Sequence, residues 1–326
     1  MLQTATQSIR HRPLSELNFM DIYVRLDAEA VPHFRAGRGG AIELPDADLP
    51  EEFREDAALL ANHLREYFTG NESAITYRDM RMRATRLETA QGEVWAALRR
   101  LPCRPTPLEK LGLIPQLPPV LQDLGRRSGL TLICGASGQG KTSTLSSLLA
   151  RYLETYGGIG FTLEDPVEYD MEGRFGENGY CYQTEIRQES DWGAMLKRAL
   201  RWHPRYIAVG EIRTPDAANH VLRAATSGHT VLATMHAGSM EEALEGLLQL
   251  AEQDIGHRAP LLLATGLTGV LYQAFSPSGL FAQFMLTEAD NSGSPIRAMI
   301  RDKRIGQTRT IADQQMAKLI QTGRIF

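Results

Sequence analysis

The sequence has 326 residues, of which 43% are hydrophobic and 23% are charged, the proportions of an ordinary soluble globular protein. Its length favours two domains, and it contains no internal repeat or low-complexity segment. The formal net charge is −4, from 35 basic and 39 acidic residues, so no bulk positive field draws the chain to nucleic acid or to an anionic membrane. We therefore expect no direct nucleic-acid binding.

The three cysteines, Cys103, Cys134 and Cys181, are too few and too widely spaced for a disulfide framework or a Cys-x-x-Cys metal site, which fits a reducing compartment. Residues 1–12 are polar and have no apolar h-region, so we expect no signal peptide. The longest apolar stretch, Ala259–Phe275, is too short and too polar for a membrane span. We predict a buried helix there and no transmembrane segment.

The first hundred residues predict a small α+β domain. Hydrophobic and polar side chains alternate over Met20–Leu26, as in a half-buried strand, and residues 33–42 are rich in Gly and Arg and predict turns. A helix is predicted from Pro50 to Gly70, because apolar residues recur there with helical spacing. Further strands are predicted at Ser73–Tyr77, Met80–Leu87 and Glu93–Leu98.

Pro102, Pro105 and Pro107 predict an extended connection, because proline disfavours helix in the residue before it. We place the domain boundary there, between residues 1–105 and 106–326. The second domain alternates strands with helices, which predicts a mostly parallel sheet covered on both faces. Its strands are predicted at Leu130–Cys134, Ile159–Leu163, Tyr206–Val209 and Thr230–Thr234, and its helices at Pro118–Arg127, Ser143–Tyr152, Asp191–Trp202 and Ala217–Ser227. After Ser239 the pattern predicts helices, interrupted by loops at Ser276–Gly279 and Asn291–Pro295.

The stretch Gly135–Thr142 has the pattern G-x-x-x-x-G-K-T and lies between an apolar strand and a helix. Glycines let the backbone curl so that several N–H groups point inward, and the positive end of the following helix adds to that field. In this context the pattern predicts a phosphate-binding loop for ATP, with Lys141 on the β- and γ-phosphates and the Thr142 hydroxyl on Mg²⁺. The predicted nucleotide contacts are Gly135, Ser137, Gly138, Gln139, Gly140, Lys141, Thr142 and Ser143.

Acidic and polar residues follow the predicted strands at the edge where ligands bind in parallel sheets. They occur in Glu164–Glu168, Gly210–Arg213 and Met235–His236. Glu211 follows an apolar strand, where P-loop proteins carry a metal-linked acid, whereas a carboxylate such as Glu164 is as readily explained by a helix N-cap. His229 and His236 form no zinc site, because no third ligand has suitable spacing, and they favour hydrogen bonding near phosphate or burial in the core.

Three ordered segments after the phosphate loop carry a family resemblance. Phe161–Tyr169, Val209–Arg213 and Gly228–Ala237 resemble the Asp box, Walker B and His box of the bacterial type II/type IV secretion ATPases. That superfamily includes the type IV pilus retraction motors. The similarity extends from about residue 15 to at least residue 275.

The resemblance implies a PAS-like N-terminal domain followed by a RecA-like P-loop domain. It implies a homohexameric ATPase in the cytoplasm, peripherally associated with the bacterial inner membrane, that works with an inner-membrane platform or core components of a secretion or pilus machine. The residues to which it assigns catalytic roles are Glu168, Glu211 as Walker B acid and second metal contact, His229, His236, Arg81 and Arg83. Without the family, Arg81 and Arg83 would be assigned to the polar face of a strand.

The sequence departs from the family pattern in several places. His203-Pro204-Arg205 stands where acids usually precede the Walker B strand, Glu88 stands where an arginine is common, and the four-cysteine zinc insertion of assembly ATPases is absent. These departures indicate a retraction-like or type IVB, conjugative-type motor. They also leave open a nucleotide-gated scaffold with weak hydrolysis. A GTPase is disfavoured because no Asn-Lys-x-Asp motif occurs, and a nucleotide kinase would leave the His box unexplained.

Overall fold

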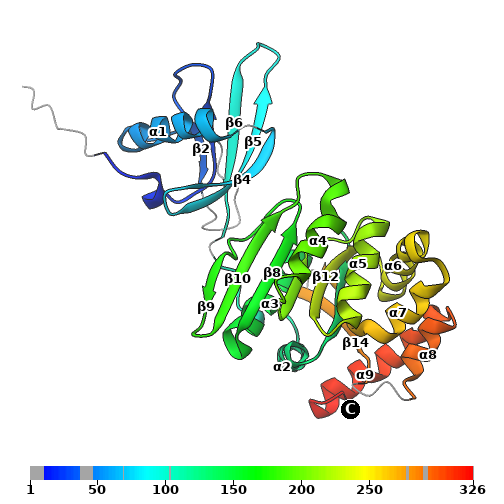
Figure 1. The fold of residues 1–326 in the computed structure, drawn as a ribbon. Coiled ribbons are helices and arrows are strands. Elements are labelled where there is room, and N and C mark those ends of the chain that lie inside the picture. Colours follow the sequence, from blue (N-terminus) through cyan, green and yellow to red (C-terminus); the bar gives the residue numbers. More distant parts are fainter. Residues whose placement is uncertain are drawn as a thin grey trace, which may run out of the picture. The chain divides into compact units, whose positions relative to one another are not determined.

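A computed structural model describes residues 11–36, 47–68, 70–102, 104–276, 279–288 and 293–325. The chain folds into two compact units. The first comprises Met1–Cys103 and Pro166–Asp170, and the second comprises Arg104–Asp165 and Met171–Phe326. Each unit has its own sheet and its own hydrophobic core (Figure 1).

The first unit is an α+β fold, as predicted, with one antiparallel sheet in the order β3-β2-β1-β6-β5-β4. Its strands are β1 (Phe19–Arg25), β2 (His33–Ala36), β3 (Ala47–Asp48), β4 (Glu72–Tyr77), β5 (Met80–Glu88) and β6 (Val94–Arg100). The helix α1 (Glu51–Tyr67) buries Phe53, Leu60 and Leu64 in the core of this unit. Apolar residues at helical spacing therefore formed the expected helix.

A buried carboxylate ties the parts of this unit together. Asp56 of α1, only 5% exposed, accepts hydrogen bonds from the Leu14 backbone N–H (2.8 Å) and the Tyr77 hydroxyl (2.8 Å). Arg78 Nη2 lies 2.6 Å from Asp56 Oδ1. Charged groups are buried only when they are paired in this way.

The second unit contains an eight-stranded sheet in the order β14-β13-β7-β12-β11-β8-β10-β9. Its strands are β7 (Gly129–Gly135), β8 (Gly158–Glu164), β9 (Gly173–Phe175), β10 (Gly179–Glu185), β11 (Tyr206–Val209), β12 (Thr230–His236), β13 (Leu267–Ser276) and β14 (Gly279–Leu286). The six from β13 to β10 run parallel, and the edge strands β14 and β9 are antiparallel to their neighbours. This confirms the predicted parallel sheet.

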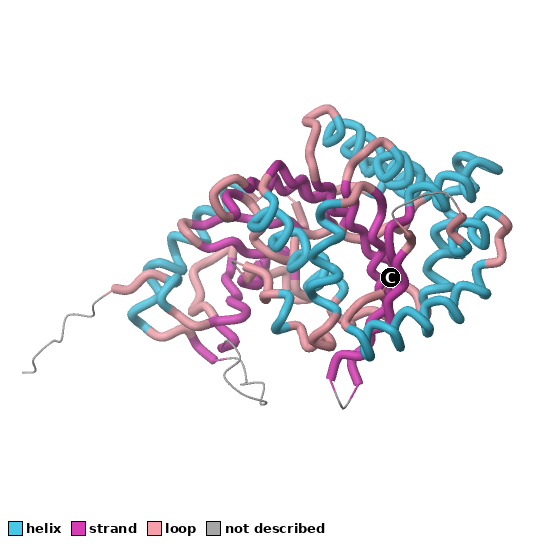
Figure 2. The backbone as a smooth tube through the Cα atoms, turned by 90° about the horizontal axis from the view of Figure 1, so that it is seen from below, coloured by secondary structure: helices cyan, strands magenta, loops and turns pink. Residues whose placement is uncertain are grey.

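Helices cover both faces of this sheet, and Figure 2 shows them on either side of the strands. They are α2 (Leu117–Asp123), α3 (Lys141–Tyr156), α4 (Trp192–Leu200), α5 (Pro215–Thr226), α6 (Met240–Ile255), α7 (Ala259–Gly266), α8 (Pro295–Arg301) and α9 (Thr308–Thr322). Two neighbouring residues of β8 point to opposite faces of the sheet. A β-carbon at Gly160 would meet Leu153 of α3 on one face, whereas the Phe161 ring on the other face packs against Trp202, which follows α4. Among the described residues, every helix is too short or too polar to span a bilayer.

The prediction after Ser239 was partly wrong. The stretch Ala259–Phe275 was predicted as one helix, but α7 ends at Gly266 and the chain continues as β13 and then β14. Apolar residues occupy both odd and even positions of this stretch, so its pattern did not separate a buried helix from a buried strand. Leu267, Val270 and Leu271 are fully buried because β13 lies inside the sheet, next to β7.

Four short or polar strands were also missed. The turn prediction at 33–42 is wrong for His33–Ala36, which form β2, and residues 37–42 lie outside the described ones. β3, β9 and β10 were not predicted at all; β3 and β9 have only two and three residues, and β10 is rich in polar side chains. Part of each predicted loop, at 276–279 and 291–295, also lies outside the described residues, as does Cys103.

Candidate nucleotide site at the carboxyl edge of the sheet

The phosphate loop connects the end of β7 to the start of α3. Gly138 and Gly140 have φ of +74° and +76°, in the left-handed region that favours glycine. A β-carbon at Gly138 would meet no heavy atom within 4 Å, so this side of the loop is open. The 16-residue helix α3 begins directly after the loop and has no side-chain N-cap, so its first N–H groups face the same opening. This arrangement is suited to holding an anion.

Lys141 is the first residue of α3 and folds back over the loop. Its Nζ donates hydrogen bonds to the backbone carbonyls of Gly135 (3.0 Å) and Ala136 (2.9 Å). Thr142 and Ser143 follow in the first turn and are half-buried, whereas Ser137 is exposed on the loop. The ammonium group therefore lies at the loop that would carry the phosphates.

The other side of the loop is fastened to β13. Gln273 Nε2 donates to the Gln139 carbonyl (2.6 Å), and the Gln139 Oε1 accepts a hydrogen bond from the backbone N–H of Phe275. Gln273 is 1% exposed, and a β-carbon at Gly135 would lie 2.4 Å from its carbonyl oxygen. Sequence reasoning missed Gln273 and Phe275 because it assigned them to a helix.

Two carboxylates lie close to the ends of β8 and β11. Glu164 is 4% exposed and accepts a hydrogen bond from Gln183 Nε2 (2.7 Å), so it joins β8 to β10. Glu211 lies just beyond β11, and its Oε2 accepts from Arg213 Nε (2.7 Å). The neighbouring Arg213 Nη1 is 3.8 Å from Asp165. Glu164 is therefore a structural carboxylate, and Glu211 is a more accessible one.

Glu168 belongs to the other unit. It is exposed in the segment Pro166–Asp170, which groups with the N-terminal sheet, and the Asp170 N–H donates to the Pro102 carbonyl (3.0 Å) in that unit. Its catalytic role remains a prediction.

The two histidines lie at opposite ends of β12. His236 is exposed and is aligned with Gly135 in the parallel register of β12 and β7, so it adjoins the phosphate loop. His229 precedes the strand, and its Nδ1 lies 2.7 Å from the Pro204 carbonyl. Seven residues of extended strand separate the two by roughly 23 Å. Only His236 therefore adjoins the loop of its own chain.

Arg81 and Arg83 lie on one face of β5, alternating with the buried Met80 and Met82. Arg81 Nη1 donates to the Thr76 hydroxyl (2.8 Å), while its buried Nε has no partner among the described residues. Arg83 Nε donates to a carboxylate oxygen of Glu72 (2.6 Å). Their predicted contact with nucleotide remains a prediction.

The side-chain oxygens at this site are suited to Mg²⁺ that arrives with a nucleotide, rather than to a metal ion held by the protein alone. Within the described ranges, no cluster of three or more His, Cys, Asp or Glu is placed to hold a metal ion. Mg²⁺ is usually bound through one or two protein oxygens together with substrate phosphates and water. Thr142 in the first turn of α3 and Glu211 beyond β11 supply oxygens of this type.

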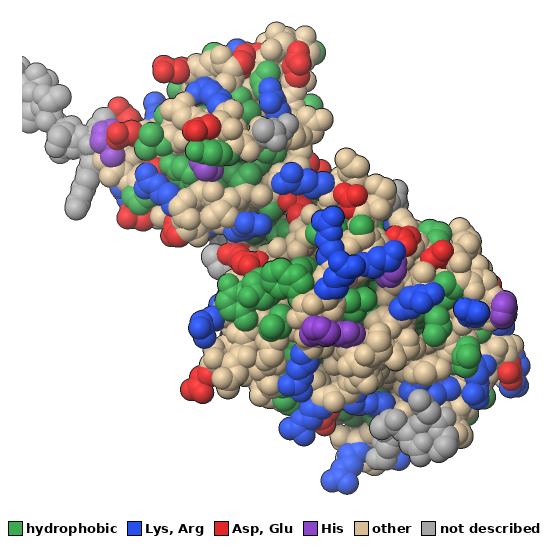
Figure 3. Space-filling view, viewed as in Figure 1, with side chains coloured by type: hydrophobic (Ala, Val, Ile, Leu, Met, Phe, Trp, Pro, Cys, Tyr) green, Lys and Arg blue, Asp and Glu red, His purple; other side chains and the backbone are tan. Residues whose placement is uncertain are grey.

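Lys and Arg side chains gather on the face of the second unit that carries α4 (Figure 3). Lys197 and Arg198 lie in the last turn of α4, and Arg201 follows it, all exposed.

Comparison with known proteins identifies the family. The sequence profile described as type II/IV secretion system protein matches residues 72–281. The chain belongs to this family. The profile match spans the phosphate loop and the three motifs that suggested it.

Among curated members of the family, a type II secretion system protein, HxcR of Pseudomonas aeruginosa, is 36% identical over 167 residues, 51% of this chain and 33% of that protein. A twitching motility protein of Neisseria gonorrhoeae is 25% identical over 291 residues, 86% of this chain and 75% of that one. The chain spans about a third or less of the length of the first three curated relatives it matches.

Solved family structures share the fold. The pilus retraction motor PilT with bound ADP superposes with a TM-score of 0.70 at 25% identity, covering 91% of this chain and 86% of that one. The Legionella pneumophila ATPase DotB gives a TM-score of 0.71 at 20% identity, covering 92% and 85%, and so indicates the fold alone. The second unit is therefore RecA-like, as predicted.

Proposed function

We propose that this chain is an ATPase that acts as a homohexamer and powers type IV secretion, conjugative transfer or type IV pilus dynamics. The observation that supports this most is the loop between β7 and α3, where two left-handed glycines and Lys141 meet an open helix N-terminus. Similarity to a retraction motor solved with ADP supports the choice of nucleotide.

In this proposal the triphosphate lies on the phosphate loop with its terminal phosphate toward β12 and β11. Lys141 exchanges its backbone partners for phosphate oxygens, and the N–H groups of the loop and of the first turn of α3 hold the remaining negative charge. Mg²⁺, held by Thr142 and directly or through water by Glu211, would neutralise charge on the β- and γ-phosphates. Glu168 serves as the base that orients the attacking water.

Because Glu168 and the two arginines belong to the N-terminal unit, hydrolysis in this proposal requires that unit as well as the phosphate loop. A head-to-tail ring lets the arginines of one subunit act at the nucleotide of its neighbour. Hydrolysis then moves subunits relative to one another. We place the ring in the cytoplasm, docked on an inner-membrane platform or on core components.

The test measures phosphate release and ATP affinity on the full chain. Lys141→Ala is expected to abolish both, whereas Glu168→Gln is expected to retain binding and lose at least a hundredfold in turnover. Glu177→Gln, an exposed carboxylate between β9 and β10, is the matched control and is expected to hydrolyse normally. Full turnover by Glu168→Gln would refute that catalytic assignment.

A specific contact keeps the scaffold alternative open. Arg213 holds the Glu211 carboxylate, and no second acid precedes β11, where His203-Pro204-Arg205 stands. If this pairing persisted with nucleotide bound, Glu211 would not reach the metal and hydrolysis would be weak. ATP binding at micromolar affinity without measurable phosphate release in the assembled ring would favour a nucleotide-gated scaffold over a motor.

A further inference from the structure

An aromatic ring stands beside the phosphate loop, on the side away from the acids. In the sheet order, β13 lies on one side of β7, whereas β12, β11 and β8 lie on the other. Glu211 lies just after β11, and His236 is the last residue of β12, both on the second side. Phe275, near the end of β13 on the first side, is 58% exposed.

Phe275 is held close to the loop by the contacts described above. Its backbone N–H is bound by the Gln139 side chain, and a β-carbon at Gly140 would lie only 3.4 Å from Phe275 Cε2. Since Gly140 carries no side chain, nothing from that residue stands between the loop and the ring. The Phe275 ring thus lies just beyond the place that a side chain of residue 140 would occupy, next to the start of α3.

We propose that Phe275 stacks on the base of the bound nucleotide. The proposal rests on the ATP site proposed above. With the terminal phosphate directed toward Glu211, the nucleoside end of the same molecule extends toward β13, where the exposed Phe275 ring lies. Base–aromatic stacking needs only a π-surface on each partner, so the contact fits any purine.

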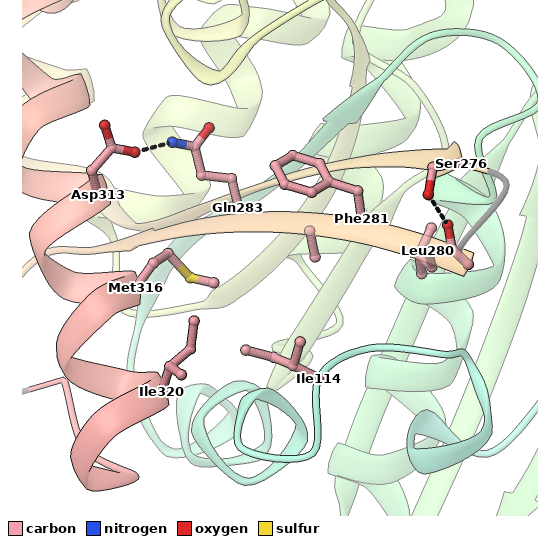
Figure 4. A pocket seen from close by; sticks show the side chains of 10 residues that line it. Ile114, Ser276, Leu280, Phe281, Gln283, Asp313, Met316 and Ile320 are labelled. Carbon is pink, nitrogen blue, oxygen red and sulfur yellow. Dashed lines mark hydrogen bonds between the residues drawn. The ribbon is translucent and has the colours of Figure 1, made fainter.

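The surroundings of the hairpin suit a neutral base rather than phosphate. Leu280, paired with Phe275 across β13 and β14, lines a groove of about 540 Å³ together with Ile114 and Met316 (Figure 4). Among the described residues that line this groove, only Asp313 is charged, and it accepts a hydrogen bond from Gln283 (2.7 Å). A carboxylate there disfavours phosphate, so the charged end of the ligand belongs on the loop and the base beside Phe275.

The experiment compares ATP with inorganic tripolyphosphate, which has the phosphates but no base, in binding assays with magnesium on the full chain. Phe275→Ala is expected to weaken ATP binding by about five- to a hundredfold and to leave tripolyphosphate binding unchanged. Phe275→Trp, which restores a stacking surface, is expected to restore the affinity. GTP should be affected as much as ATP.

A matched control is Trp202→Ala, which removes another exposed aromatic ring (55%) that precedes β11 and does not adjoin the loop; its ATP affinity should not change. Unchanged ATP affinity in Phe275→Ala would overturn the stacking. So would an equal loss of ATP and tripolyphosphate binding, since that indicates a distorted loop. A wild-type chain that binds neither ligand would instead overturn the proposed function.

Discussion

At the residue scale, Gly138 shows how one missing side chain serves the site. Its φ of +74° strains any other residue, and a β-carbon there would project into the open side of the loop. We expect Gly138→Ala to lower the free energy of unfolding by only about 1–2 kcal/mol. ATP affinity is expected to fall by more than tenfold, because the methyl group occupies the phosphate position.

Denaturant unfolding and equilibrium ATP binding measure the two effects of Gly138→Ala. Gly228→Ala is the matched control, because Gly228 also has a positive φ (+98°) and open space but precedes β12 at the opposite edge of the sheet. It should show a similar loss of stability without a loss of affinity. Normal ATP binding by Gly138→Ala would argue against this loop as the phosphate site.

A second residue-scale prediction concerns Tyr77. Burial, followed by the hydrogen bond to Asp56, raises the pKa of its hydroxyl to about 12. The unfolded tyrosine ionises near pH 10, so the stabilisation is complete below about pH 10 and is lost as the pH rises toward 12. The free energy of unfolding of the chain is expected to fall over this range, and Tyr77→Phe should make the fall smaller. An identical pH profile for Tyr77→Phe would contradict the assignment.

At the element scale, the hairpin of β13 and β14 could not be predicted from the sequence. The phosphate loop, β7 and α3 were predicted because their glycines and periodic apolar residues have local physical consequences. The hairpin was not, since β13 is buried on both faces from Leu267 to Leu271 and its apolar and polar side chains do not alternate regularly there. As a result the Gln139–Gln273 contact, which joins residues 134 positions apart, was not predictable from local pattern.

The distribution of the site over strand ends follows the same logic. A parallel sheet brings Gly135 and His236 side by side, which their order in the sequence predicted through the strand-end rule. That rule says nothing of the amino ends of strands, where His229 bonds to Pro204. The motif therefore assigned His229 and His236 to one site, although the length of β12 separates them.

An element-scale prediction concerns the outer edge of β14, which α9 covers. Buried Gln315 of α9 donates to the Leu286 carbonyl (2.8 Å) and accepts from its N–H (2.8 Å), so one side chain satisfies both backbone groups at the edge. Gln315→Ala should lower the free energy of unfolding by about 1–3 kcal/mol and speed hydrogen exchange at Leu286. Gln314→Ala, on the exposed side of the same helix, should do neither.

At the scale of the whole molecule, the proposed ring predicts complementation between inactive chains. Lys141→Ala lacks the phosphate-loop cation, whereas Arg83→Ala lacks one of the arginines proposed to act at a neighbour's nucleotide. If the arginine acts across a subunit boundary, a mixed ring contains sites with an intact loop from one chain and an intact arginine from the next. Random 1:1 mixing makes about a quarter of the sites complete in a closed ring.

Phosphate release should therefore recover to roughly a quarter of the wild-type rate in the mixture, although each variant alone is nearly inactive. Arg86→Ala, an exposed arginine later in β5, is the control and should hydrolyse normally by itself. An arginine that serves the nucleotide of its own chain gives no recovery, because every mixed chain lacks either the loop cation or the arginine. If mixed rings release no phosphate, the result would contradict the proposal that Arg83 acts at a neighbouring subunit's nucleotide. That coupling would then no longer support a hexamer.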